Sequence, residues 1–314
     1  MKNYKQISKR IIMINPKHFN YNVETADNNH FQKNNIDFSE KRRNEKASLE
    51  FKGFIQKLKE KKITVKVYED REDVKTTDSV FPNNWISFHQ EGKIILYPMY
   101  SPNRRKERRN DIIEDLKDEG FIIEEIIDLT HYENIGSYLE GTGSMVLDRE
   151  NKICYAALSE RTSHTVLMDL CEKLNYKLIH FHAYQSVKSK RLEIYHTNVL
   201  MCLGAEYCII CLDSIDCKEE EKKLINSLKK TNKQIIEISE DQMNRFAGNM
   251  LQVENIYDEK YLIMSSAAYN SLNEKQKKNI LYYNEIIHSD LSTIETLGGG
   301  SARCMIAENF LEKK

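Results

Sequence analysis

Three side chains far apart in the sequence have the types that covalent hydrolysis needs: the thiol of Cys304, the imidazole of His196 and the carboxylate of Glu140. A covalent hydrolase combines a nucleophile, a general base and a group that orients the base. Cys304 follows the run Gly298–Gly300, whose backbone can approach a ligand closely and adopt positive φ. Arg303 precedes the cysteine, and a neighbouring cation favours the reactive thiolate. Cys304 is therefore the predicted nucleophile.

Two other groups of residues have spacings that suggest metal ligands. Cys208 and Cys211 lie on a predicted strand, where residues three apart face opposite sides, and no second cysteine pair follows. We interpret them as core residues. His180 and His182 share one strand face without further ligands, and we interpret them as incidental. The sequence therefore predicts no metal.

The elements that must position the catalytic groups recur along the chain. Short apolar strands begin near Trp85, Met145, Val199, Leu251 and Met305, which are 60, 54, 52 and 54 residues apart. Even spacing of this size predicts repeats of one unit instead of two unrelated domains. The first four units read as strand, strand, helix, strand. The predicted helices cover 104–119, 163–174, 217–231 and 267–279, and the predicted third strands cover 121–128, 177–182, 234–238 and 283–287.

The last unit has only its first strand, and pieces near the N-terminus can complete it. These pieces are the strand Ile11–Asn15, the helix Glu40–Lys61 and the strand Ile63–Tyr68. Five units joined head to tail close into a ring without exposed sheet edges. The predicted fold class is α/β, a five-bladed propeller of pseudo-fivefold ββαβ repeats in one catalytic domain over residues 1–314. A doubly wound sheet is disfavoured because two strands precede each helix and no Gly-rich dinucleotide loop follows a strand. The polar stretch Asn20–Ser39 is predicted to be a mobile loop.

In such a ring, equivalent positions of the units meet near the central axis. Polar residues precede the first strand of each unit, and they are Asn84, Glu140, His196 with Asn198, Asn249 and Cys304. The repeat therefore predicts that a cysteine, a histidine and a glutamate from distant parts of the sequence come together. Without the repeat, His196 would be interpreted as an ordinary core or surface residue and Glu140 as a solvated turn residue.

Several short motifs resemble those of a known superfamily. They are Phe81-Pro82-Asn83-Asn84-Trp85, Glu140-Gly141-Thr142-Gly143-Ser144, His196-Thr197-Asn198, Asn244-Arg245-Phe246-Ala247-Gly248-Asn249 and Gly298-Gly299-Gly300-Ser301-Ala302-Arg303-Cys304. In this order, over nearly the whole chain, they resemble the arginine deiminase and amidinotransferase superfamily, the penteins, whose members modify guanidino groups. The stretch Asn20–Asn29, with Phe31 shortly after, resembles the citrulline-utilisation hydrolase branch. The resemblance implies a pentein propeller with its site on the axis, a Cys–His–Glu catalytic set, and no metal or organic cofactor.

Two positions depart from the arginine deiminase pattern and bear on the substrate. Where those enzymes have aspartates that hold the cationic guanidinium, this chain has Asn84 and Asn198. A carboxylate facing a buried cation makes a charge-assisted bond, which an amide cannot replace. An amide offers both a donor and an acceptor, which suits a neutral ureido group. The sequence thus favours citrulline as the substrate.

Three further residues are candidates for contacts with the substrate. Arg245 or Arg303 could bind its carboxylate, because a guanidinium matches a carboxylate bidentately. Asn249 is a third candidate for a substrate contact. Glu140 is expected to hydrogen bond to the substrate nitrogens.

Composition limits the partners and the location. Lys and Arg number 47 against 48 Asp and Glu, so the basic excess typical of nucleic-acid-binding proteins is missing. The basic clusters Arg104–Arg109 and Lys229–Lys233 are interpreted as solvated helix faces. No apolar run approaches the ~20 residues of a membrane helix, and the N-terminus does not resemble a signal peptide. Seven cysteines without framework spacing predict free thiols. We expect a cytoplasmic enzyme with a small amino-acid substrate, and a homo-oligomer is left open.

Other functions fit parts of the same pattern. Within the superfamily, the chain could be an arginine deiminase, a dimethylarginine hydrolase or an amidinotransferase. A transferase would need room for an acceptor amine and exclusion of water. In another class, it could be a non-catalytic binding propeller, which predicts no Cys–His–Glu set on the axis.

Overall fold

Five sheets of one design make up most of the computed structural model, which describes residues 4–34 and 38–314. In each sheet the first strand pairs antiparallel with the second, and the second pairs parallel with the third. Sheet by sheet, from the first to the third strand, they are β3 (Ile86–Phe88), β4 (Lys93–Leu96) and β5 (Glu125–Asp128); β6 (Val146–Asp148), β7 (Ile153–Leu158) and β8 (Lys177–His182); β11 (Met201–Leu203), β12 (Tyr207–Ile210) and β13 (Gln234–Glu237); β14 (Leu251–Glu254), β15 (Lys260–Ser265) and β16 (Glu285–Ser289); and β17 (Ala307–Glu308), β1 (Arg10–Asn15) and β2 (Thr64–Glu69). This recurring design explains the even spacing of the apolar strands in the sequence.

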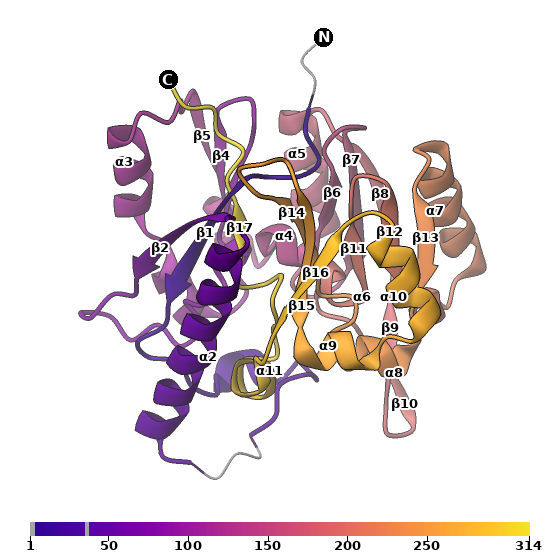
Figure 1. Cartoon of the computed structure of the whole chain (residues 1–314), viewed down its shortest axis with the longest axis horizontal. Coiled ribbons are helices and arrows are strands. Elements are labelled where there is room, and N and C mark those ends of the chain that lie inside the picture. Colours follow the sequence, from indigo (N-terminus) through magenta and orange to yellow (C-terminus); the bar gives the residue numbers. More distant parts are fainter. Residues whose placement is uncertain (1–3, 35–37) are drawn as a thin grey trace.

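Helices make the crossover that each parallel strand pair requires. They are α3 (Asn110–Asp118), α5 (His164–Leu174), α7 (Lys218–Lys230), α9 (Ser266–Ser271) with α10 (Glu274–Leu281), and α2 (Glu40–Glu60). Among them, α3 buries an apolar stripe of Ile112, Ile113 and Leu116. These helices lie at the periphery, with α3 and α7 at opposite ends of the molecule (Figure 1). Over the two described ranges, no helix is both long and apolar enough to cross a bilayer.

The N-terminal strands complete the sheet that begins with β17. Ile12 of β1 pairs with Ala307 of β17 on one side and with Lys66 of β2 on the other. The prediction that N-terminal pieces finish the last unit is confirmed. The N-terminal stretch that begins at residue 4 and the C-terminus consequently lie on the same side of the molecule (Figure 1).

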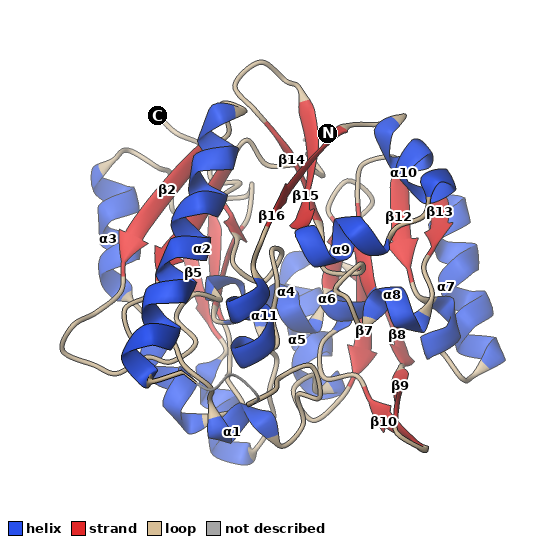
Figure 2. Cartoon of the chain, turned by 60° about the horizontal axis from the view of Figure 1, so that its bottom comes forward, coloured by secondary structure: helices blue, strands red, loops and turns tan. Residues whose placement is uncertain are grey.

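Short helical turns before the first strands bring distant segments together. The turns are η1 (Pro82–Asn84), α4 (Gly141–Ser144) and α6 (Thr197–Leu200), and α4 lies against both others. Strand β11 lies between β6 and β14, and β17 lies beside β3. Figure 2 shows α4, α6 and α11 (Ser292–Gly298) in the middle of the molecule, inside the peripheral helices. The residues that precede the first strands therefore gather in the interior.

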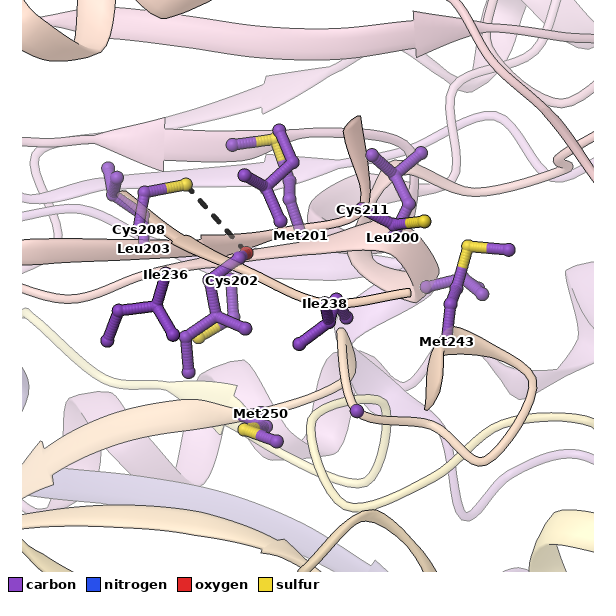
Figure 3. Close-up of a cluster of buried hydrophobic side chains, with 14 of the residues drawn as sticks. Leu200, Met201, Cys202, Leu203, Cys208, Cys211, Ile236, Ile238, Met243 and Met250 are labelled. Carbon is purple, nitrogen blue, oxygen red and sulfur yellow. Dashed lines mark hydrogen bonds between the residues drawn. The ribbon is translucent and has the colours of Figure 1, made fainter. Parts of the chain in front are cut away.

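A dense apolar core surrounds β11 and β12 (Figure 3). Met201, Cys202 and Cys208 are buried in it, with Met243 and Met250 from later segments. Burial raises the pKa of Cys202 to about 12 and the pKa of Cys208 well above its usual value. The interpretation of Cys208 and Cys211 as core residues is confirmed, because both are fully buried.

Three segments differ from the prediction. The predicted helix 104–119 is interrupted: η2 (Pro102–Glu107) precedes α3, and its Arg104 is buried instead of solvated. The stretch 20–39, predicted as a mobile loop, contains α1 (Val23–Ala26) and buried residues, while residues 35–37 lie outside the described ranges. A hairpin of β9 (Tyr184–Val187) and β10 (Lys190–Glu193) follows β8 and was not predicted. Local patterns did not show these features because burial of Arg104 and of segment 20–34 depends on tertiary contacts.

Candidate active site

Cys304 sits in a tight turn directly after α11. Gly299 ends that helix in the left-handed region at φ +63°, and the Cys304 amide donates to the Ser301 carbonyl at 2.9 Å. Asn249 Nδ2 lies 3.2 Å from the Cys304 sulfur and Asn198 Nδ2 lies 3.4 Å from it. Two amide donors therefore point at a buried thiol, and donors of this kind stabilise negative charge on sulfur.

The imidazole and the carboxylate form a direct pair. His196 Nε2 is 2.8 Å from Glu140 Oε2, and both side chains are buried. The backbone amide of Tyr100 donates to the other oxygen of Glu140 at 3.0 Å. Gly141 has φ +48°, and a Cβ there would lie 2.2 Å from the Asn83 carbonyl oxygen. A glycine at this position thus lets the loop that carries Glu140 pack against η1.

Two buried guanidinium groups compensate the charge of Glu140. Arg161 Nη1 is 3.5 Å and Arg104 Nη1 is 4.0 Å from Glu140 Oε2. Burial opposes ionisation of Glu140, but Arg161, His196 and Arg104 together hold its pKa well below the usual value. Burial lowers the pKa of His196 to about 4, although the hydrogen bond with Glu140 acts in the opposite direction. At neutral pH the pair is therefore a carboxylate and a neutral imidazole that can accept a proton.

Cys304 and His196 line one small cavity. Its polar wall consists of Asn84, Asp78, Arg104, Arg161 and Tyr195, and the rest is formed by Phe81, Gly298, Gly300, Thr25 and Asn29. Two amide or carboxylate oxygens near it, Asn198 Oδ1 and Asp78 Oδ1, are buried without a hydrogen-bond partner among the described residues. Unpaired buried acceptors are costly unless a ligand satisfies them, so these atoms indicate where a substrate donates.

The described part of segment 20–34 covers this cavity. Arg161 donates to the Thr25 carbonyl at 2.8 Å and to Asn28 Oδ1, and Asn29 Nδ2 donates to the Gly298 carbonyl at 3.3 Å. The Tyr195 hydroxyl donates to the Gly299 carbonyl at 2.6 Å. The segment therefore holds both an arginine of the cavity and the loop before Cys304.

Most of the predicted site residues come together, but not in every predicted role. Asn84 lines the cavity, while Asn198 and Asn249 contact the sulfur. Glu140 lies behind His196, fully buried, instead of on the cavity wall.

The two arginines predicted to bind a carboxylate lie elsewhere. The guanidinium of Arg303 pairs with Glu308 at 2.8 Å and donates to the Ile306 carbonyl at 2.9 Å. Arg245 lines a separate cavity of about 450 Å³. Adjacent residues in the turn point to opposite sides, so the proximity of Arg303 to Cys304 in sequence does not place its side chain at the sulfur.

Sequence reasoning missed three residues of the cavity: Asp78, Arg104 and Arg161. Arg104 stood in a basic cluster that was interpreted as a solvated helix face, yet Nη1 donates to Asn84 Oδ1 at 2.8 Å and the guanidinium pairs bidentately with Glu107. Asp78 accepts from Asn22 at 2.6 Å. For Asp78, its position three residues before the Phe81–Trp85 motif was the available signal. Arg161 had none.

A match to one family model defines the family. The family model described as "N,N dimethylarginine dimethylhydrolase, eukaryotic" matches residues 15–311. The chain belongs to this family. Its place among the guanidino-modifying penteins and its enzyme class, a hydrolase of C–N bonds, are thereby confirmed, whereas the citrulline branch is not specified. No curated protein matches the chain.

Solved structures of similar fold cover nearly all of the chain. The apo structure of ArgZ, an arginine dihydrolase from the ornithine-ammonia cycle in Cyanobacteria, has a TM-score of 0.71 and 18% identity over 95% of this chain and 40% of ArgZ. A substrate-bound variant of the N-terminal domain of ArgZ has a TM-score of 0.70 and 19% identity, over 96% of this chain and 99% of that domain. A dimethylarginine dimethylaminohydrolase variant carrying an S-methyl-L-thiocitrulline adduct has a TM-score of 0.62 and 16% identity, over 96% of this chain and 99% of that one. At these identities the likeness shows the fold, and the chain spans less than half of full-length ArgZ.

Asn249→Asp tests whether the amide donor of Asn249 stabilises negative charge on the Cys304 sulfur. The variant keeps an acceptor for the Arg303 amide, which donates to Asn249 Oδ1 at 3.0 Å, but puts a negative charge beside Cys304 in place of a donor. We expect alkylation of Cys304 by iodoacetamide at pH 7 to slow by about tenfold or more, because a lost charge-assisted bond is worth roughly 1.5–3 kcal/mol. Peptide mass spectrometry measures the rate, with the exposed Cys217 as internal reference. An unchanged ratio of the two rates would contradict the role of Asn249.

The buried neutral imidazole predicts a loss of stability in mild acid. The pKa of His196 is about 4 in the folded state and about 6.5 when unfolded, so between these values only the unfolded chain binds the proton. The free energy of unfolding should therefore fall as pH decreases from about 6.5 to about 4, with His196 contributing up to about 1.4 kcal/mol per pH unit. Urea unfolding of wild type, His196→Asn and, as control, the exposed His131→Asn measures this slope. A His196→Asn slope equal to that of both others would show that His196 is charged in the folded protein.

Proposed function

We propose that the chain hydrolyses a C–N bond in the ureido group of a free amino acid, most favourably citrulline, through a covalent intermediate on Cys304. The unpaired Asn198 Oδ1, on the amide whose Nδ2 lies 3.4 Å from the sulfur, carries this proposal. It offers a neutral acceptor where the reacting carbon must sit. Asn84 presents a second amide to the cavity, with its Oδ1 held by Arg104.

The far end of the cavity suits the amino and carboxylate groups of an amino acid. Arg104 and Arg161 supply guanidinium groups for a carboxylate, and they replace Arg245 and Arg303 in this role. Asp78 Oδ1 is an unpaired buried acceptor for an ammonium. Burial raises the pKa of Asp78, and an ammonium beside it would favour the ionised form. A free amino acid therefore fits this end better than an amine without a carboxylate.

The chemistry proceeds in two steps. The Cys304 sulfur attacks the ureido carbon while its proton passes to the neutral His196, whose ionised form Glu140 stabilises. His196 then protonates the departing nitrogen as the C–N bond breaks, leaving the acyl group on sulfur. Water attacks this thioester-like carbon, and His196 takes its proton and returns it to the departing sulfur, which regenerates the thiol. The carbamic acid that is released then loses carbon dioxide to give the free amine. With citrulline and water, complete hydrolysis yields ornithine, carbon dioxide and ammonia.

We also propose that the five sheets form a closed five-bladed propeller around a pseudo-fivefold axis. The support is the identical pairing of the sheets, the contacts of β11 with β6 and β14 and of β17 with β3, and the completion of the last sheet by β1 and β2. In such a ring, η1, α4 and α6 meet at the axis, where Cys304 lies.

A guanidino substrate is the second candidate. The matched family is described by dimethylarginine hydrolysis, and the neighbour ArgZ is an arginine dihydrolase. Either substrate would use the same nucleophile. They differ in charge at the reacting end, and this difference can be measured.

Ammonia and amine release from citrulline, arginine, dimethylarginine and N-carbamoylputrescine tests the proposal. We expect citrulline to give the highest kcat/KM, and N-carbamoylputrescine, which lacks the carboxylate, to fall by roughly a hundredfold because a buried charged contact is lost. Cys304→Ala should abolish turnover, and Cys217→Ala should not alter it. Preference for arginine or dimethylarginine would establish the second candidate, and no hydrolysis at all would point to a transferase or a binding protein.

Asn198→Asp separates the effect of substrate charge from a general loss of rate. The new carboxylate faces the reacting end, so the ratio of kcat/KM for arginine to that for citrulline should rise by about tenfold or more. The ratio cancels any loss caused by the missing donor to Cys304. An unchanged or lower ratio would mean that Asn198 does not contact the ureido end.

A further inference from the structure

A second cavity lies behind the nucleophile. It measures about 30 Å³, and its charged lining residues are Arg149, Arg303 and Glu308. Because Arg303 and Cys304 are adjacent in a tight turn, one side chain reaches this cavity while the other lines the candidate active site. The mechanism above uses none of these three charged groups.

Both arginines share one carboxylate oxygen. Arg303 Nη2 lies 2.8 Å and Arg149 Nη2 lies 3.8 Å from Glu308 Oε2. All three residues are buried, with 5–8% of their surfaces exposed. Arg149 Nη1 also contacts His89 Nδ1 at 3.3 Å, and burial holds the pKa of His89 well below its usual value, so this partner is neutral.

The remaining wall adds no negative charge. Its apolar part includes Met201, Cys202, Leu203 and Met250, which belong to the core of Figure 3. The Cys202 thiol stays protonated because burial raises its pKa to about 12. Gln6 Nε2 donates to the Leu147 carbonyl, and Thr142 contributes only a hydroxyl. The cavity therefore contains two cations and one anion in apolar surroundings.

An excess charge in such surroundings is costly unless a counter-ion compensates it. The cavity volume of about 30 Å³ exceeds the ~10–15 Å³ that one bound water molecule needs, which leaves room for a monatomic ion. We propose that this cavity binds a single chloride ion between the guanidinium groups of Arg149 and Arg303. The bound ion would neutralise the Arg149–Glu308–Arg303 cluster and stabilise the turn that carries Cys304.

Anomalous diffraction from crystals of the full chain grown in sodium bromide tests the site directly. Bromide replaces chloride and scatters anomalously, so the proposal predicts a peak between the guanidinium groups of Arg149 and Arg303. Absence of that peak at high bromide, with water between the arginines, would overturn it.

Thermal unfolding in solution provides the second test, with chloride exchanged for gluconate at constant ionic strength. We expect chloride to raise the Tm of the wild type by roughly 3 °C, since an ion that binds only the folded state stabilises it. Arg149→Met leaves the neutral Arg303–Glu308 pair and should lose the chloride effect. Glu308→Gln leaves two uncompensated cations and should show a larger chloride effect than the wild type.

The two substitutions are expected to change the effect of chloride on Tm in opposite directions, so the test remains informative if one variant unfolds. Glu308→Gln is expected to be less stable than the wild type in gluconate, but its gain in chloride should still exceed the wild-type gain. Equal responses to chloride in the wild type and either variant would overturn the proposal and leave a hydrated ion-pair triad.

Discussion

The carboxylate of Glu140 is fully buried, and the arrangement of the site depends on compensating its charge. An isolated carboxylate in such a place would be protonated or would unfold its surroundings. Here Arg161, Arg104, His196 and the Tyr100 amide surround it. Removing one partner of a buried ion pair typically costs 3–5 kcal/mol, because the other partner is left unpaired. The geometry of His196 is consequently tied to groups that never touch the reacting atoms.

These partners come from different parts of the fold. Tyr100 and Arg104 follow β4, Arg161 follows β7, and His196 precedes α6. Arg161 is in turn held by Thr25 and Asn28 of the N-terminal segment. One buried charge thus links the first three sheets and the segment that covers the cavity, so the His196–Glu140 pair is correctly placed only when these elements have all docked.

The chemistry of the cavity follows from how its charges are distributed. Glu140 is ionised, whereas His196 stays neutral and can accept a proton. Around the sulfur, the contacts are amides instead of carboxylates, with Asn198 and Asn249 donating. The charged groups Asp78, Arg104 and Arg161 therefore line the same cavity as Cys304, whose sulfur is contacted by neutral amides. Behind Cys304, the separate cluster of Arg149, Arg303 and Glu308 is shielded from the cavity by the turn itself.

The sequence by itself determined the repeat, the completion of the last sheet by N-terminal strands, and the gathering of Cys304, His196, Glu140 and three asparagines. These are consequences of local patterns, since strand periodicity and loop position recur with the unit. Only the tertiary structure decided which charged side chains reach the interior. Arg104 and Arg161 are buried because Glu140 is buried beside them, and Arg303 turns away because Glu308 and the Ile306 carbonyl hold it. A guanidinium looks the same in sequence whether it faces water or a carboxylate, and its long side chain lets distant partners set its direction.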